Sequence, residues 1–108
     1  MEVFQVMKKN LKIRMPKEVD HHSAEKIRHQ ADRYIVQKNI SHIEFDFRDT
    51  EFMDSSGIGL IMGRYQNLHL LGGSVSATHV NEHIFKILQL SGIAKVIQIE
   101  RALFWNRG

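Results

Sequence analysis

Segments with the apolar spacing of a strand are followed, three times along this chain, by longer segments with the apolar spacing of a helix. In the clearest strand segment Ile43, Phe45 and Phe47 alternate with Glu44 and Asp46. Strands that alternate with helices pair mostly in parallel, because each helix returns the chain to the end of the sheet where the next strand begins. The pattern therefore predicts an α/β fold.

The predicted order of elements is ββαβαβαβ, which begins with a hairpin. Because the strands alternate polar and apolar side chains, we expect a mixed, mostly parallel sheet with the helices mainly on one face and a wetter opposite face. Ser23 and Asn81 are expected to cap the first and third helices, Gly72-Gly73 to end the second and Gly92 to end the third. The expected strands are residues 3–7, 11–15, 42–47, 74–78 and 96–99, and the expected helices are residues 24–35, 55–71 and 82–91.

The length and composition favour one self-folding domain. A chain of 108 residues has room for a single domain, expected over residues 1–108 and beginning at or near Met1. It has no cysteine, no apolar stretch near the roughly 20 residues that span a bilayer and no secretion signal, so we expect a cytoplasmic protein without membrane contact. Its 15 basic and 12 acidic residues are spread along the chain, which is only a weak argument for nucleic-acid binding, and we expect no direct contact with nucleic acid. Leu103, Phe104 and Trp105 in the tail 101–108 either dock on the body or stay exposed.

The segment that begins at Asp54 is unusual for a helix start. An aspartate or a serine there satisfies free backbone N–H groups, so capping alone explains Asp54 and Ser55. Capping does not explain Gly57, Gly59 and Gly63, since each glycine inside a helix costs about 1 kcal/mol relative to alanine. The last two lie one turn apart and leave room for close approach, either of the chain's own sheet or of another protein, and their spacing favours neither.

Three sequence motifs of known chemistry are excluded because their residues do not have the required spacing or position. A hydrolase elbow requires a glycine two residues before its serine, where this chain has Met53 or Asp54. The dinucleotide fingerprint requires its third glycine one position earlier than it occurs. His79 and His83 match H-x-x-E-H, but a helix capped by Asn81 leaves the first histidine outside it. We therefore expect no catalytic residue, no cofactor and no metal ion.

The chain resembles the anti-sigma factor antagonists with the STAS fold. The resemblance lies in Phe52-Met53-Asp54-Ser55-Ser56-Gly57-Ile58-Gly59, in the strand before it and in Gly63-Arg64-Tyr65 after it. The loop Glu18-Val19-Asp20-His21-His22-Ser23-Ala24-Glu25 makes the chain most similar to the sporulation branch, which antagonises the anti-sigma-F factor, with the general-stress branch a close second. The likeness runs from the first strand to about Glu100. Lys17 is a departure, because relatives usually have glycine there.

The resemblance implies a function for Ser55, the first serine of the Asp-Ser-Ser-Gly motif. In the family that serine is phosphorylated by the anti-sigma factor, which is itself a serine kinase. The unphosphorylated antagonist binds this kinase and frees the sigma factor, and a phosphatase restores that form. By this resemblance the chain is not an enzyme. We expect a partner-binding surface made of Asp20, His21, Asp54, Ser56, Gly57, Gly59, Gly63 and Arg64.

Two functions of other classes are left as alternatives. One is a small nucleotide-binding or nucleotide-hydrolysing protein that uses the glycines and the loop at Asp20 and His21, which would bind ATP or GTP without a protein partner. The other is a basic nucleic-acid binder, whose affinity for duplex DNA would fall steeply with salt.

Overall fold

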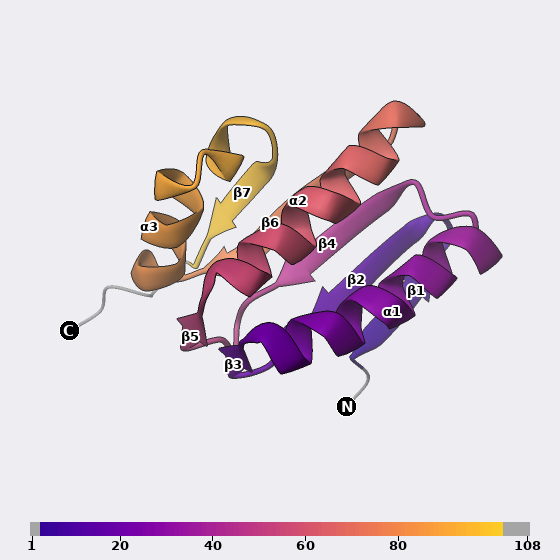
Figure 1. The fold of residues 1–108 in the computed structure, drawn as a ribbon. Coiled ribbons are helices and arrows are strands. Elements are labelled where there is room, and N and C mark those ends of the chain that lie inside the picture. The colour runs from indigo at the N-terminus through magenta and orange to yellow at the C-terminus, as the bar shows by residue number, and fades with distance from the viewer. Residues whose placement is uncertain (1–2, 103–108) are drawn as a thin grey trace.

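The structure is a computed structural model in which residues 3–102 are described. The predicted α/β architecture is confirmed: five strands form one sheet in the order β1-β2-β4-β6-β7, and only the β1–β2 hairpin is antiparallel (Figure 1). The strands of this sheet are β1 (Phe4–Met7), β2 (Asn10–Arg14), β4 (His42–Asp46), β6 (Ser74–Val80) and β7 (Gln98–Arg101). The helices are α1 (His21–Gln37), α2 (Ser55–Leu70), α3 (Glu82–Leu90) and the short 3-10 helix η1 (Ile93–Lys95).

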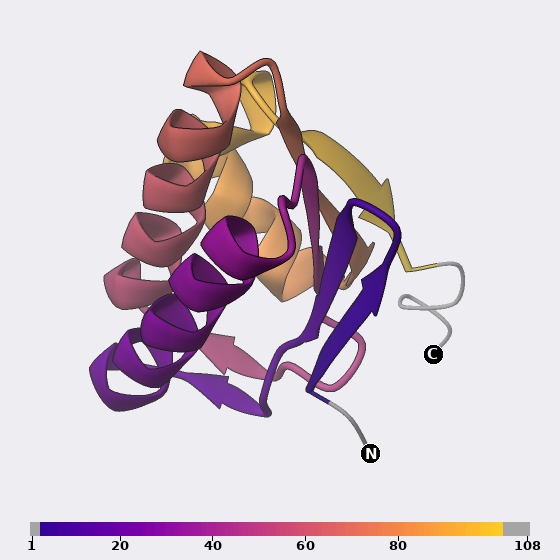
Figure 2. The ribbon, with the colours of Figure 1, turned by 90° about the vertical axis from the view of Figure 1, so that its right-hand side faces the viewer.

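The helices cover one face of the sheet, as the strand pattern predicts. Figure 2 shows α1, α2 and α3 on the same side of the five strands. Ile43 and Phe45 of β4 point to that side and are fully buried, whereas Glu44 and its cross-strand neighbours Lys12 and Ser76 belong to the opposite face. The buried residues of the helices form one hydrophobic core with those of the strands; they include Ala24, Ile27 and Ala31 of α1, Leu60, Ile61 and Leu68 of α2, and Ile84 and Leu88 of α3.

Two short strands form a second, separate sheet that the sequence pattern does not reveal. β3 (Glu18–Val19) pairs in parallel with β5 (Phe52–Met53). Val19 and Met53 are buried, while Glu18 and Phe52 are exposed. Because two residues are too few to show a period, the chain offers no strand signal at either place.

The prediction that Ser23 caps α1 is wrong. The helix begins at His21, three residues earlier than predicted, and Asp20 is the N-cap: its side chain accepts a hydrogen bond of 3.0 Å from the Ser23 backbone N–H. The Ser23 hydroxyl accepts in turn from the Asp20 N–H, also at 3.0 Å, which completes a capping box. Aspartate and serine are comparable caps, so the sequence alone did not separate them.

The last strand begins two residues later than predicted. Gly92 adopts a positive φ of 86°, and η1 follows it before β7 starts at Gln98. Ile99 then pairs with Ala77 of β6, which sets the register of this edge. Val96, predicted in the strand, instead ends η1 and is about half exposed. The tail residues whose docking was left open lie outside the described residues.

Candidate functional site

The small sheet joins the beginnings of α1 and α2. Val19 is in register with Met53, and the Asp54 N–H donates a 3.1 Å hydrogen bond to the Val19 carbonyl. The next residues along the two strands are the two N-caps, Asp20 and Asp54, so the helices start side by side. In Figure 1 both starts lie next to β3 and β5 at one end of the molecule.

Asp54, and neither serine, caps α2. Its backbone is extended (φ −100°, ψ −171°), and its Oδ1 accepts a 2.8 Å hydrogen bond from the Ser56 N–H. Ser55 is the first residue of the helix and is exposed. Within residues 3–102 its hydroxyl has no hydrogen-bond partner. Capping therefore does not occupy the Ser55 hydroxyl, and the residue that carries it is exposed.

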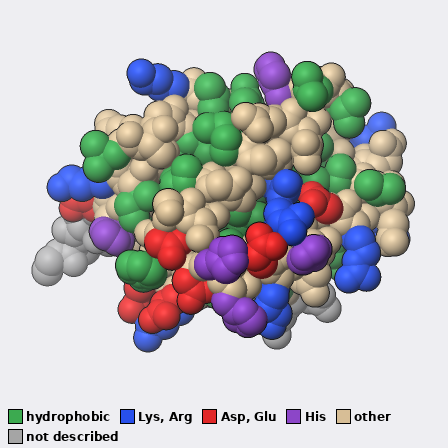
Figure 3. All heavy atoms as spheres, in the orientation of Figure 1, with side chains coloured by type: hydrophobic (Ala, Val, Ile, Leu, Met, Phe, Trp, Pro, Cys, Tyr) green, Lys and Arg blue, Asp and Glu red, His purple; other side chains and the backbone are tan. Residues whose placement is uncertain are grey.

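The electrostatic surroundings of Ser55 combine helix dipoles with carboxylates. Two adjacent helix N-termini present partial positive charge from their unpaired N–H groups. Asp20 lies among these groups, and hydrogen bonds from the Ser23 backbone and hydroxyl lower its pKa. Figure 3 shows acidic, histidine and basic side chains together over the part of the surface where α1 begins. By sequence Asp20, His21, His22 and Glu25 belong to the N-cap and first turns of this helix. Asp20 and Asp54 thus place a carboxylate at each helix start, while Glu25 is paired with Arg28 at 2.9 Å.

The three glycines of α2 differ in what surrounds them. Gly57 is buried, and a Cβ atom there would overlap the Met53 side chain and lie 3.0 Å from Val19 Cγ1. Gly59 is exposed and Gly63 half-buried, and a Cβ atom at either would have nothing within 4 Å in the described part of the chain. Packing against the chain's own sheet, one of the two explanations left open above, therefore accounts for Gly57 but not for Gly59 or Gly63.

Arg64 is buried between α1 and α2. Its side chain is 8% exposed, and its Nε lies 3.1 Å from Oδ1 of Asp32 on α1, although no directed hydrogen bond forms there. Burial lowers the pKa of Arg64, and the charge of Asp32 opposes that shift. Leu60, Ile61, Arg64 and Leu68 share one buried stripe at helical spacing, which was the sequence signal for this placement.

The remaining candidates are distributed as follows. His21 is exposed at the first position of α1, and Ser56 is half-buried in the first turn of α2. Phe52, immediately before the site, leaves 48% of its surface exposed, and sequence reasoning did not assign it a role although it belongs to the recognised segment. An exposed aromatic ring on a protein surface is a typical anchor for a partner protein.

The histidine pair considered for zinc is split between two elements. Asn81 is the N-cap of α3, as predicted, with its Oδ1 accepting a 2.9 Å hydrogen bond from the Ile84 N–H. His79 lies in β6 with a positive φ of 53°, and its Nδ1 is 3.1 Å from Asp46. The described residues contain no group of three side chains that could hold a metal ion. They also contain no helix long and apolar enough to cross a membrane.

Comparison with known families matches residues 3–103 to the STAS domain. The chain belongs to the STAS-domain family. Among its relatives, the Anti-sigma F factor antagonist of Paenibacillus polymyxa is 36% identical over 87 residues, which cover 81% of this chain and 74% of that protein. The Anti-sigma-B factor antagonist of Listeria monocytogenes is 23% identical over 77% of this chain and 72% of its own length.

Solved structures support the same family assignment. The chain superimposes on the anti-sigma factor antagonist SpoIIAA in its unphosphorylated form with a TM-score of 0.75 and 30% identity, covering 92% of this chain and 88% of that one. For SpoIIAA in its phosphorylated form, described as a Bacillus cell fate determinant, the TM-score is 0.72 and the identity 32%, with 89% of each chain covered. The fold and the anti-sigma factor antagonist resemblance predicted from the sequence are thus confirmed.

Proposed function

We propose that this chain is an anti-sigma factor antagonist whose binding is switched by phosphorylation of Ser55. The observation that carries the proposal is the position of the Ser55 hydroxyl, exposed and free of hydrogen bonds within the described residues, at the start of α2. Asp54 performs the capping, so modification of Ser55 does not remove the bond that holds the helix end. The hydroxyl is therefore available to a kinase without a cost to the fold.

A phosphate at Ser55 is compatible with the folded chain. It would sit at the N-terminus of α2 and next to that of α1, where free N–H groups and helix dipoles favour an anion. SpoIIAA, which is about one-third identical to this chain, has been solved in both phosphorylated and unphosphorylated forms, and both superimpose well on it. These likenesses support a switch that changes the surface rather than the fold.

The same phosphate would disrupt a protein interface at this place. It adds roughly −1.5 to −2 charges beside the carboxylates of Asp54 and Asp20. Like charge or a desolvated phosphate inside an interface costs several kcal/mol, which is about a hundredfold or more in affinity. The unphosphorylated form is therefore the form that binds.

The partner is an anti-sigma factor that is also a serine kinase, and a phosphatase reverses the modification. The proposed contact surface combines the exposed Gly59 with the half-exposed Gly63, over which a partner can approach the backbone of α2. Around this strip lie the site residues at the two helix starts, Asp20, His21, Asp54, Ser56 and Phe52. Gly57 and Arg64, expected on this surface, are buried, so we assign them the role of positioning α2 against β5 and α1.

The sporulation branch is the proposed pathway, since the relative that antagonises anti-sigma F shares 36% identity with the chain and the one that antagonises anti-sigma-B shares 23%. The chain acts as a binding module without catalysis of its own. Its proposed location is the cytoplasm, where sigma factors act, and it needs no contact with DNA or membranes.

The decisive experiment is phosphorylation in vitro followed by mass spectrometry of peptides. The chain is incubated with ATP and its cognate anti-sigma factor kinase, and the phosphate is expected on Ser55. Ser55→Ala should remain unmodified, and the neighbouring Ser56→Ala should be modified as the wild type is. Phosphate on Ser56, or none on a folded chain in an active kinase mixture, overturns the proposal. Calorimetry with ATP and with GTP alone tests the nucleotide-binding alternative.

A further inference from the structure

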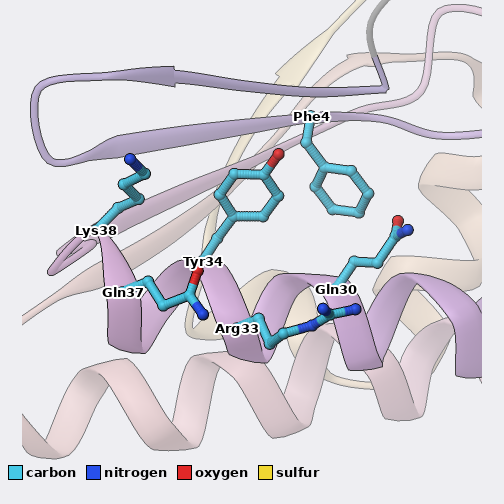
Figure 4. A pocket seen from close by; sticks show the side chains of 6 residues that line it. All are labelled: Phe4, Gln30, Arg33, Tyr34, Gln37 and Lys38. Carbon is cyan, nitrogen blue, oxygen red and sulfur yellow. The ribbon is translucent and has the colours of Figure 1, made fainter.

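A groove follows the outer side of α1, where the helix faces the edge strand β1. One part of it, of about 420 Å³, is lined by Phe4 and by four residues of α1 and its C-cap Lys38 (Figure 4). A second part, of about 510 Å³, continues toward the start of α1. Gln30 lines both parts, so they adjoin. The lining residues of α1 recur at helical spacing, which makes the groove one continuous stripe: Ser23, Lys26, Ile27, Gln30, Arg33 and Tyr34.

The floor of the groove is apolar. The rings of Phe4 and Tyr34 stack with their centroids 5.2 Å apart and their planes 23° from parallel, so β1 and α1 are joined beneath the first part. The second part is lined by Val3, which is 46% exposed, and by Pro16, above Ile27 and Met15, which are almost completely buried, so its open apolar surface comes mainly from Val3 and Pro16. Apolar side chains of a ligand placed here would leave water for a packed surface.

The rim of the groove is basic. Lys26, Arg33 and Lys38 are exposed, and within residues 3–102 none of them has a carboxylate within ion-pair distance. The carboxylate that does line the groove, Asp49, is held by Arg14 at 2.9 Å. Three cations therefore line an apolar floor without a neutralising partner in the described chain. Such a field attracts and orients an acidic ligand.

We propose that this groove is a docking site for an acidic, amphipathic peptide segment of a protein partner. Apolar side chains of the peptide, such as leucine, would cover Phe4 and Tyr34 in the first part and Val3 in the second. Its carboxylates would pair with the three cations of the rim. From Ser23 to Lys38 the helix rises about 22 Å at 1.5 Å per residue, which fits a partner segment of about seven extended or fifteen helical residues.

The chain's own tail does not match this groove. Residues 103–108 read Leu-Phe-Trp-Asn-Arg-Gly, with an arginine and no carboxylate side chain. They follow β7, which is at the opposite edge of the sheet from β1. Single-stranded nucleic acid is also disfavoured, because the aromatic rings in the groove stack on each other rather than standing free for bases.

The groove is separate from the Ser55 site. The side of α1 that faces α2 carries Asp32, which pairs with Arg64, whereas the groove residues belong to the side that faces β1. The Ser23 end of the groove adjoins Asp20 through the capping box, so a partner bound over the start of α2 leaves open the part of the groove from Lys26 to Lys38. The proposal does not depend on phosphorylation, and Ser55→Asp should bind the acidic peptide as the wild type does.

The test is NMR titration of the ¹⁵N-labelled chain with a synthetic 15-residue peptide of leucine and glutamate at helical spacing. The amide shifts are expected to change along α1 from Ser23 to Lys38 and at Phe4. The double variant Lys26→Glu with Arg33→Glu should weaken binding by about tenfold or more. The matched control Lys86→Glu with Lys95→Glu, which makes the same charge change on α3 and η1, should weaken it by less than about twofold.

Three results would overturn the proposal. The first is the absence of shifts at the groove at millimolar peptide, or their appearance elsewhere. The second is equal weakening by both double variants, which would mean that net charge alone attracts the peptide. The third is a competing probe that binds the same residues as tightly as the leucine and glutamate peptide does. The probes are a glutamate and serine peptide, anionic phosphatidylglycerol vesicles and duplex DNA. Equal binding of any of them would mean that the apolar floor contributes nothing. Circular dichroism confirms that each variant is folded.

Discussion

The Asp54 N–H donates a hydrogen bond of 3.1 Å to the Val19 carbonyl, and this bond links the start of α2 to the start of α1. It extends the short parallel pairing of β3 with β5 by one residue, up to the two helix caps. The Ser55 hydroxyl is thereby held on a rigid support, although it is itself exposed. A modification there changes charge at a fixed position, which suits a switch read by another protein.

Ser55→Asp is expected to abolish binding to the anti-sigma factor kinase while leaving the fold intact. The carboxylate adds a charge where Asp54 and Asp20 already lie, and like charges at an interface reduce affinity by about a hundredfold. Isothermal titration calorimetry measures the affinity and circular dichroism the fold. Ser55→Ala is the control and should bind as the wild type does. A folded Ser55→Asp that binds with unchanged affinity would count decisively against the switch.

Gly57→Ala and Gly59→Ala should change stability in opposite directions. The first places a methyl group against Met53 and Val19, and the cost of overpacking exceeds the helical gain, so the free energy of unfolding falls by about 1 kcal/mol. The second has open space and gains up to about 1 kcal/mol from the better helix former. Urea denaturation of both variants measures the difference.

Gly59→Gln tests whether the open glycine strip serves binding. A Cβ atom at Gly59 has nothing within 4 Å in the described chain and the position is exposed, so glutamine there should leave the fold unaffected, but its side chain would block a partner's approach to the backbone of α2. We expect at least a tenfold loss of affinity for the kinase, which corresponds to about 1.4 kcal/mol. Asn67→Lys, further along the exposed side of α2, is the control for a general surface change. Undiminished binding by the Gly59 variant would remove the strip from the interface.

Asp20→Asn should make the stability of the chain less sensitive to acid. Hydrogen bonds from Ser23 lower the pKa of Asp20 in the folded state below its ordinary value of 3.8. The ionised form therefore stabilises the fold fully above the unfolded pKa, and this contribution is lost as the pH falls through the folded pKa. Asparagine is also a good cap, so the variant keeps the helix start without a titrating group.

The measurement for Asp20 is urea unfolding of wild type and variant at several pH values. The difference in free energy of unfolding should be largest above about pH 5 and should shrink toward about pH 2. A difference that stays constant over that range would show that the charge of Asp20 contributes nothing beyond its hydrogen bonds.

The larger elements of the fold were predictable because they are long enough to repeat a pattern. The alternation of β4 gives both its strand character and the face that the helices cover, and Asn81 marks the start of α3. The pairing of β3 with β5 was not predictable, since two residues carry no period and the contact spans more than thirty residues of sequence. The support of the Ser55 site is made of these short strands.

The candidate site, like the fold, was predictable from the sequence only in part. The motif predicts where Ser55 lies, and the structure adds which glycines face outward. Spacing along a helix does not reveal whether Gly57 or Gly59 points inward, because that depends on Val19 and Met53 from elsewhere. The charge of Arg64 predicts a surface position. Only its place on the apolar stripe of α2 indicates that it is buried.

Removing Asp32 alone should lower the free energy of unfolding, because Arg64 then stays buried without its partner. Replacing Arg64 and Asp32 together should change it little. Asp32→Ala leaves the buried Arg64 guanidinium without its main opposite charge, and since Asp32 is 39% exposed we expect a loss of about 1 to 2 kcal/mol in the free energy of unfolding. Arg64→Met keeps the volume and removes the charge, so it should be nearly neutral. The double variant should then recover most of the loss, because no unpaired cation remains between α1 and α2. A double-mutant cycle in urea measures the coupling. If the two single effects simply add, the pair does not hold the helices together and Arg64 is positioned by packing alone.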